Sequence, residues 1–432
     1  MQSIVRWIAG VVLFVAVCAA SLARGETTVV ARHGASLRAS VDGRAVLVLR
    51  GSHAERGVAH GVLGAREILE TVDFLAAKLN TIGALVDPDR TAADKPRINW
   101  QNFCKAAEHF EMPDRFREEL AGMLHGIEQA LPAEADRTLK ATGQAITLAD
   151  LSALQTCDVL ELMRCSQFSV WGDLTDDGQV LVGRNWDYPP VFSSTTYCVF
   201  AVEPTEPELS PTLDAMWFGM LGTGMAALNR HGIYLAANDG GVHRSMLAVE
   251  HPTPAAVVGR MLIEAMTPDD APEFLRTFLK DRVTLALIFH LVVPASSPGQ
   301  ATRAYALEFA PWADAARSLL REPDLARSNC LVCTNHFVAN SPQATGNTAE
   351  RYGLLADGIR AHRKRDEKID FEAARKLLDA VGRRSPLNTT QYSAVAWPAE
   401  RKLRIAVSPK TGKSATAEPY VLFEWDELFG LK

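Results

Sequence analysis

The sequence has no long run of basic residues that could follow a nucleic-acid backbone. Its 45 lysines and arginines are outnumbered by 51 acidic residues, which gives a formal net charge of −6. Nucleic acid is therefore not expected as a partner. The chain also has no apolar run of the about 20 residues that span a bilayer, so we expect no stable membrane insertion once the N-terminal apolar segment is removed.

The cysteines and histidines are not spaced to hold a metal ion. Cys330 and Cys333 form a lone CxxC pair, and no second pair or His-rich partner follows at zinc spacing. The pair reads as part of a strand, where positions three apart point to opposite faces. The glycine-containing stretch GSHAERGVAHG at 51–61 lacks the GK[ST] ending of a phosphate-binding loop. We predict neither a metal nor any other cofactor.

The N-terminus has the features of an export signal. Arg6 supplies the positive start, residues 8–20 form the apolar segment, and small residues within 21–25 offer a cleavage site. We expect residues 1–25 to be a cleaved signal peptide, with an uncleaved anchor as the alternative. The mature protein would then be secreted or periplasmic, where its six remaining cysteines could form disulfides.

Hydrophobic periodicity predicts a helix-rich first part and a strand-rich second part, with neither an internal repeat nor a low-complexity linker. Helices are expected at 65–85, 114–130, 149–163, 254–266, 271–279, 348–362 and 371–381. Strands are expected at 44–50, 165–172, 179–187, 197–203, 215–221, 226–229, 233–238, 283–293, 303–309, 330–335, 392–397 and 402–408. Hairpin signals between the strands indicate antiparallel pairing, so we predict one compact domain with a layered α+β fold.

Cys165 lies where a predicted helix gives way to a predicted strand. Thr147, with Asp150 three residues later, is a capping-box start for that helix. A turn at 176–178 then returns the chain along the strand that starts at Cys165. Depending on loop length, Asp187 is expected to face Phe168 or Ser166, and either register brings it to the Cys165 end.

Arg184 and Asp187 are three residues apart on the returning strand. A regular strand would place their side chains on opposite faces. A site that uses both therefore requires a bulge or a strand end near Trp186.

Several sequence blocks together resemble a known family. The blocks are GSHAERGVAHG at 51–61, CSQF at 165–168 with WG at 171–172, GRNWD at 183–187, Asn229 and Gly232 leading to Asn238, and TNHF at 334–337 followed by Arg351. In this order they resemble the cysteine N-terminal-nucleophile (Ntn) hydrolases, and within them the autoproteolytic acyltransferases that include isopenicillin N acyltransferase. No single block is specific, but their order extends over most of the chain.

The resemblance implies a four-layer αββα sandwich of two antiparallel sheets and self-cleavage between Arg164 and Cys165. Residues 26–164 would become the first chain and residues 165–432 the nucleophile-bearing chain, within one Ntn-type domain. Cleavage would give Cys165 a free α-amine, whose ordinary pKa of about 7.7–8.0 suits a general base. Arg164 departs from the pattern, because family members often have a small residue before the nucleophile.

The resemblance also implies roles for the other blocks. Arg184 would favour the thiolate, and Asp187 would orient the α-amine. Asn335 is the leading oxyanion donor and Asn238 the second candidate. Arg351 and Trp186 are candidates for substrate binding, with bracing of the site as the alternative for Arg351.

Simpler interpretations exist for each candidate. Cys165 alone could be a core residue, Asp187 a turn residue, and Asn238 part of an ordinary turn. His336 beside Asn335 could suggest a Cys–His pair, although adjacent strand residues face opposite ways.

We predict an exported cysteine amidase or acyltransferase that acts on a linear amide of a small molecule through a thioester. A lipid amidase or phospholipase B-like hydrolase, or a non-catalytic binding protein on the same fold, is the alternative. The acyl group, the acceptor and the oligomeric state stay open.

Overall fold

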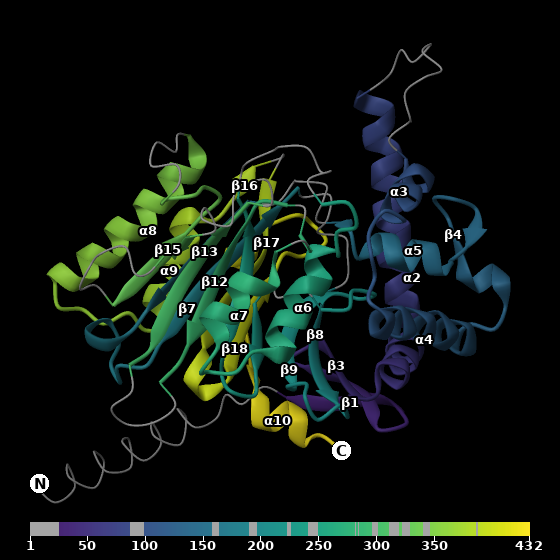
Figure 1. The fold of residues 1–432 in the computed structure, drawn as a ribbon, viewed down its shortest axis with the longest axis horizontal. Helices are drawn as coiled ribbons and strands as arrows, with labels where there is room; N and C mark the ends of the chain where they lie inside the picture. Colours follow the sequence, from purple (N-terminus) through teal and green to yellow (C-terminus); the bar gives the residue numbers. More distant parts are fainter. Residues whose placement is uncertain are drawn as a thin grey trace, which may run out of the picture.

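The computed structural model describes most of the chain (Figure 1). The described residues are 26–86, 99–157, 164–189, 197–222, 226–240, 249–280, 282–283, 285–295, 301–310, 319–321, 329–339, 346–385 and 388–432. The expected signal peptide, 1–25, lies outside them, as does the end of the helix predicted at 149–163.

Two large sheets form the centre of the described molecule. The ten-stranded sheet has the order β1 (Thr27–His33), β2 (Ser36–Val41), β3 (Arg44–Gly51), β8 (Tyr197–Pro204), β9 (Thr212–Trp217), β10 (Ala227–Asn229), β11 (Tyr234–Asp239), β12 (Leu287–Val293), β13 (Arg303–Phe309), β14 (Leu319–Arg321). The seven-stranded sheet has the order β15 (Cys330–Cys333), β6 (Arg164–Val170), β7 (Leu181–Tyr188), β17 (Asn388–Trp397), β18 (Lys402–Val407), β19 (Val421–Glu424), with β16 (Arg384–Ser385) paired to β17. A small separate pair joins β4 (Thr138–Leu139) and β5 (Gln144–Ala145).

Helices flank the sheets on several sides. They are α2 (His53–Val86), α3 (Trp100–Ala107), α4 (Asp114–Ala130), α5 (Leu148–Leu154), α6 (Ala255–Ala265), α7 (Ala271–Phe278), α8 (Asn347–Lys364), α9 (Phe371–Val381) and α10 (Trp425–Gly430). In Figure 1, α2 to α5 stand together at one side of the sheets, and α8 and α9 lie at the opposite side.

Three hydrophobic cores separate the layers of the sandwich. Side chains of both sheets, such as Leu213 and Leu403, share the largest core. A second core packs α6 and α7 on the ten-stranded sheet, and a third packs α8 and α9 on the seven-stranded sheet. The order helix, sheet, sheet, helix confirms the predicted αββα sandwich.

One strand pair departs from the prediction of purely antiparallel sheets. Strand β3 pairs with β8 in parallel, with Val46 opposite Val199. Parallel neighbours need a long crossover, and here the chain between β3 and β8 builds α2 to α5 and the first strands of the other sheet. The other neighbouring strands of the two sheets pair antiparallel.

The predicted register of the β6–β7 hairpin is wrong in both of its forms. Asp187 pairs with Arg164, and Cys165 pairs with Trp186. The connection is longer than the turn at 176–178, because a 3₁₀ turn at Gly172–Leu174 precedes it and the Gly172 amide donates to the Gly178 carbonyl at 3.0 Å. Asp187 nevertheless reaches the Cys165 end, as both registers required.

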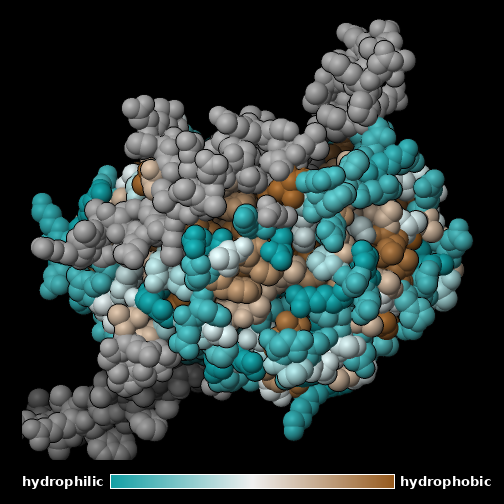
Figure 2. Space-filling view, viewed as in Figure 1, coloured by the Kyte–Doolittle hydropathy of each residue, from teal (hydrophilic) through white to brown (hydrophobic). Residues whose placement is uncertain are grey.

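Apolar side chains are largely withdrawn from the surface. Figure 2 shows hydrophilic residues over most of the described surface on one face, with smaller hydrophobic areas among them. Among the described residues, the exposed large hydrophobic side chains are those of Val30, Leu148 and Leu354. In that same part of the chain, no helix has the length and apolar character needed to cross a membrane.

Candidate active site

Cys165 is the second residue of β6, and its side chain lies in the core between the two sheets. It is fully buried. Arg184 of β7 approaches it, with 3.7 Å between Nη2 and the Cys165 Sγ. The chain continues as a strand through the Arg164–Cys165 bond, so this is the site before any cleavage.

Arg184 connects the nucleophile candidate to the opposite sheet. Its Nη1 donates to Asn238 Oδ1 at 2.7 Å, and its Nη2 donates to the Ala237 carbonyl at 2.7 Å. Gln167 also donates to Asn238 Oδ1, at 2.8 Å. These bonds fix the guanidinium beside the sulfur, which is the position that favours a thiolate.

Burial opposes that effect in the uncleaved chain. Desolvation raises the pKa of the Cys165 thiol to about 11, while the positive charges of Arg184 and Arg351 lower it in part. The thiol is therefore protonated near neutral pH. Water reaching this end of β6 would weaken the desolvation and leave the two arginines to act.

Asn335 holds the backbone on one side of the expected cleavage point. Its Oδ1 accepts from the Cys165 backbone amide at 2.6 Å, and its Nδ2 donates to the Asp239 carbonyl at 2.9 Å. The Asn238 amide donates to the Thr334 carbonyl at 3.1 Å. Both oxyanion candidates thus lie at the site, and their amide groups donate to main-chain carbonyls.

Arg351 of α8 holds the backbone from the other face of β6. Its Nη1 donates to the Cys165 carbonyl at 2.6 Å and to Ser166 Oγ at 2.5 Å, and its Nη2 donates to Asn335 Oδ1 at 2.9 Å. The same side chain lies 3.8 Å from Asp187 Oδ2. These contacts match the bracing alternative for Arg351.

Asp187 lies on the α8 side of β7 and does not share the face of Arg184. The Thr390 hydroxyl donates to its Oδ1 at 2.6 Å. The pairing of β7 with β17 is irregular beside it, between Thr390 and Tyr392, which is a bulge in the partner strand. Burial raises the pKa of Asp187 to about 6, although Arg351 and Thr390 lower it in part.

Trp186 is buried and lies in an aromatic cluster. It stacks on Tyr188 with 4.9 Å between ring centroids, and its ring lies 5.3 Å from that of Trp217 and 6.3 Å from that of Tyr197. In this uncleaved chain the indole has no open face for a substrate, since Trp186 is 1% exposed. Its predicted role in substrate binding stays a prediction.

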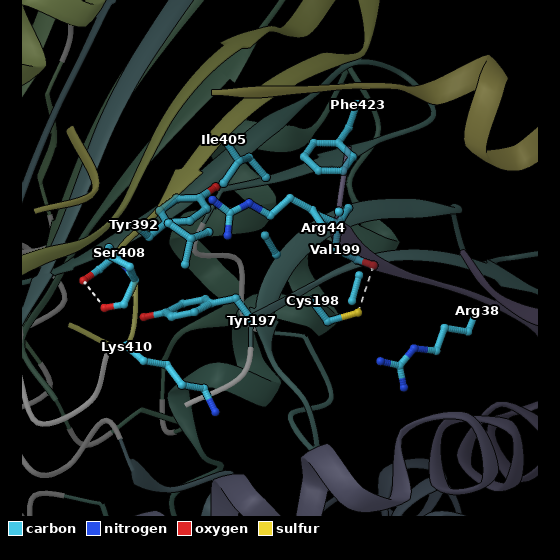
Figure 3. Close-up of a pocket in the computed structure, with 15 residues that line it drawn as sticks. Arg38, Arg44, Tyr197, Cys198, Val199, Tyr392, Ile405, Ser408, Lys410 and Phe423 are labelled. Atoms are coloured by element: carbon cyan, nitrogen blue, oxygen red, sulfur yellow. Dashed lines mark hydrogen bonds between the residues drawn. The ribbon is translucent and has the colours of Figure 1, made fainter. Parts of the chain in front are cut away.

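A cavity of about 320 Å³ opens beside this cluster at the edge of the sandwich (Figure 3). Tyr197, Tyr392 and Arg44 are among the residues that line it. Tyr392 pairs with Trp186, which pairs with Cys165, so two strand spacings of about 4.8 Å separate the cavity wall from the nucleophile strand. The cavity lies next to the site without reaching Cys165 itself.

Two alternatives from the sequence are placed elsewhere. His336 contacts the hydroxyls of Thr334 and Thr348 through Nδ1, at 3.1 and 3.0 Å, which does not fit the Cys–His pair. Cys330 and Cys333 do not form a disulfide, and they belong to different cores on opposite sides of β15. Within the described residues no group of three or more His, Cys, Asp or Glu is placed to hold a metal ion.

Sequence reasoning missed several polar residues that complete the site. Gln167 and Ser169 share the face of Cys165 on β6, and both contact the buried His290, at 3.3 and 3.0 Å. Asp239 pairs with Arg164, with 3.2 Å between Oδ2 and Nη1. The signal for the first two was the alternation C-x-Q-x-S along one strand face.

The family comparison agrees with the sequence blocks. A family model described as acyl-coenzyme A:6-aminopenicillanic acid acyl-transferase matches residues 174–352. The predicted resemblance is confirmed. The match covers less than half of the chain and begins after Cys165. It supports an acyltransferase or amidase of the Ntn type.

Solved structures are similar only at low identity. Penicillin V acylase from Agrobacterium tumefaciens is 13% identical with a TM-score of 0.37, and the similarity covers 56% of this chain and 83% of that chain. A mutant of conjugated bile acid hydrolase from Clostridium perfringens is 12% identical with a TM-score of 0.38, covering 60% of this chain and 96% of that chain. No curated protein sequence matches.

Proposed function

We propose that the chain is an exported cysteine Ntn-type enzyme that cleaves, or transfers the acyl group of, a linear amide through a thioester. The observation that carries the proposal is the convergence on Cys165. Arg184 lies 3.7 Å from its sulfur, while Asn335 and Arg351 hold its backbone amide and carbonyl. A core cysteine would need none of these polar and charged partners.

The first step of the proposal is self-cleavage. The Cys165 thiol attacks the Arg164 carbonyl carbon and a C–S bond forms, and the C–N bond breaks as the thiol proton passes to the nitrogen. Water then adds to this thioester, and the carboxylate of Arg164 and the free thiol are released. The products are a chain that ends at Arg164 and a chain that begins with the amine of Cys165.

The second step uses the new amine as a base. It takes the thiol proton as the sulfur attacks the substrate amide, and it returns a proton to the leaving amine. Arg351 holds the Cys165 carbonyl and lies 3.8 Å from Asp187 Oδ2, which supports a role for the carboxylate in orienting the amine through Arg351 or directly. Asn335 or Asn238 would donate to the oxyanion once its amide exchanges a main-chain carbonyl for the substrate.

The partner in this proposal is a small acyl-amide, and water or an amine is the acceptor. The N-terminal apolar segment supports export, and the formal net charge of −6 argues against nucleic acid. The proposed chemistry requires no cofactor, because the thiol, the amine and the arginines supply the nucleophile, the base and the positive charge.

Intact-mass analysis of the purified protein tests the proposal. We expect the wild type to contain a component that begins at Cys165 and ends at Lys432, and Cys165→Ala to remain joined at 164–165. Cys198→Ala is the matched control, because Cys198 is also buried in a strand but lies outside the site. It should mature and turn over like the wild type.

An active wild-type enzyme that still carries the 164–165 bond would overturn the proposal. So would Cys165→Ala that still cleaves at this bond.

A further inference from the structure

The residue before the nucleophile candidate is held by an ion pair that the proposed chemistry does not use. Arg164 Nη1 lies 3.2 Å from Asp239 Oδ2. The Arg164 side chain is 39% exposed and that of Asp239 is 11% exposed, so the carboxylate is the more enclosed partner. Asp239 ends β11 of the opposite sheet, so the pair crosses between the two sheets.

The position of Asp239 is fixed relative to Cys165. The Asp239 carbonyl accepts from Asn335 Nδ2 at 2.9 Å, and Asn335 Oδ1 accepts from the Cys165 amide at 2.6 Å. One asparagine therefore ties the backbone beside the carboxylate to the backbone beside the sulfur. Cleavage at 164–165 removes no atom of Asn335 or Asp239.

Self-cleavage and turnover pass through the same kind of intermediate. In self-cleavage the acyl group on the Cys165 sulfur is that of Arg164, and in turnover it is that of the substrate. Because the sulfur, Asn335 and Asp239 are common to both, the volume that holds the Arg164 side chain lies where the acyl side of a substrate would lie. If the Arg164 side chain leaves after cleavage, a positively charged group of a substrate can take its place beside Asp239.

We propose that Asp239 is the acyl-side recognition residue of the mature enzyme, and that its substrates carry a guanidinium or ammonium group on the acyl part of the amide. This inference rests on the proposed function. It adds a substrate class, that of cationic acyl amides, to a site for which the general chemistry leaves the acyl group open.

The self-cleavage of the chain provides the first test, because the chain itself fixes the bond that is cleaved and no synthetic leaving group has to be chosen. Arg164→Gln removes the charge and keeps part of the stem, and we expect it to mature about tenfold or more slowly, while Arg164→Lys stays within a few fold of the wild type. The exchange Arg164→Asp with Asp239→Arg should recover most of the rate lost in Arg164→Asp alone. Maturation of Arg164→Gln at the wild-type rate would overturn the proposal.

Two synthetic probes provide the second test. N-acetyl-arginyl and N-acetyl-citrullinyl anilides have nearly the same shape and differ in charge. We expect mature wild type to prefer the arginyl probe by about tenfold or more in kcat/KM. Mature Asp239→Asn should lose that preference. The rates are normalised to the amount of protein cleaved at 164–165, which mass spectrometry measures. Asp357→Asn, an exposed acid-to-amide change on α8, is the control and should keep it.

Each result separates the inference from the proposed function. Equal loss on both probes in Asp239→Asn would mean that Asp239 serves the α-amine, and this overturns the acyl-side assignment. An active mature enzyme that cleaves neutral acyl amides but not the arginyl probe also overturns it, and leaves the Ntn chemistry intact. An intact 164–165 bond in active enzyme rejects the proposed function, and the inference with it.

Discussion

Asp187 is a buried carboxylate whose environment favours its neutral form. Its ordinary pKa of 3.8 rises to about 6, because desolvation outweighs the attraction of Arg351 and the hydrogen bond from Thr390. The folded state therefore binds this proton more tightly than the unfolded state. Its contribution to stability is lost as the pH rises from about 4 through about 6, and the ionised carboxylate is held at a cost above that.

Asp187→Asn should separate catalysis from stability. We expect most turnover to be lost in the otherwise wild-type chain, because an amide cannot hold the α-ammonium as a carboxylate does. In the uncleavable Cys165→Ala background, the same change should make the chain at least as stable as its parent at pH 8. That advantage should shrink toward pH 4, where the carboxyl is neutral in the folded state and only partly ionised in the unfolded state. Thermal unfolding at pH 4, 6 and 8, with turnover measured separately, checks both parts.

Two results would count against this interpretation of Asp187. Wild-type turnover in Asp187→Asn would remove the residue from the mechanism. A large loss of stability at pH 8, with no dependence on pH, would show that the side chain matters as a packing element instead.

At the scale of elements, the glycines of α2 show what the sequence pattern concealed. The stretch at 51–61 was expected to precede the helix at 65–85, but α2 begins at His53. Gly57 and Gly61 face α4, where a Cβ on Gly61 would lie 2.1 Å from the Met123 carbonyl oxygen. The glycines therefore permit backbone contact between two helices, although glycine usually signals a turn.

Gly61→Ala should destabilise the protein by about 1–3 kcal/mol or more, because neither backbone can move away easily. Gly353→Ala is the matched control, since Gly353 lies in α8 and a Cβ there meets nothing within 4 Å. It should be neutral or stabilising by up to about 1 kcal/mol. Urea unfolding of both variants on the Cys165→Ala background measures the difference. Equal stabilities would show that α2 and α4 can separate at little cost.

Elements defined by local signals were predictable, and their pairing was not. The sequence predicted the helices at 114–130 and 371–381 with the bounds that the structure has, since both carry a strong apolar stripe. The Thr147–Asp150 capping box is also confirmed. Strands β1 and β2 were missed.

The site was predictable only in part. The structure brings Cys165, Arg184, Asn238, Asn335 and Arg351 together, and their roles stay predictions. Ser166 and Gln167 were recognised only as part of a sequence block, and Asp239 was not selected. Their contacts depend on which strands and helices pack against β6, which no local pattern encodes. The parallel pairing of β3 with β8 was missed for the same reason, since no local pattern encodes it.

At the scale of the whole molecule, a buried group of charges joins the helices beside the sheets to the outer helix layer. Glu119 of α4 bonds to Arg260 of α6 at 2.8 Å and to His53 of α2 at 2.6 Å. Arg260 also donates to Glu264 at 2.7 Å. The three helices α2, α4 and α6 are thus connected through one carboxylate that is 1% exposed.

Burial alone would raise the pKa of Glu119, but Arg260, the hydrogen bond from His53 and the charge of Arg56 together hold it well below its usual range. The folded state therefore favours the ionised form. The stability that this gives is present above the ordinary pKa of 4.5, and is lost as the pH falls below it.

Glu119→Gln leaves Arg260 without this charge partner in a buried position, so we expect a loss of about 3–5 kcal/mol at pH 7. The loss should shrink on acidification, because the wild-type carboxylate itself becomes costly to keep ionised as the pH falls below its unfolded pKa. Urea unfolding at pH 7, 5 and 4 on the Cys165→Ala background measures this change. Glu118→Gln is the control, because the Glu118 side chain is exposed. This variant should have nearly wild-type stability at each pH. Parallel stability curves for Glu119→Gln and its parent across this range would show that the carboxylate does not connect the helices as an anion.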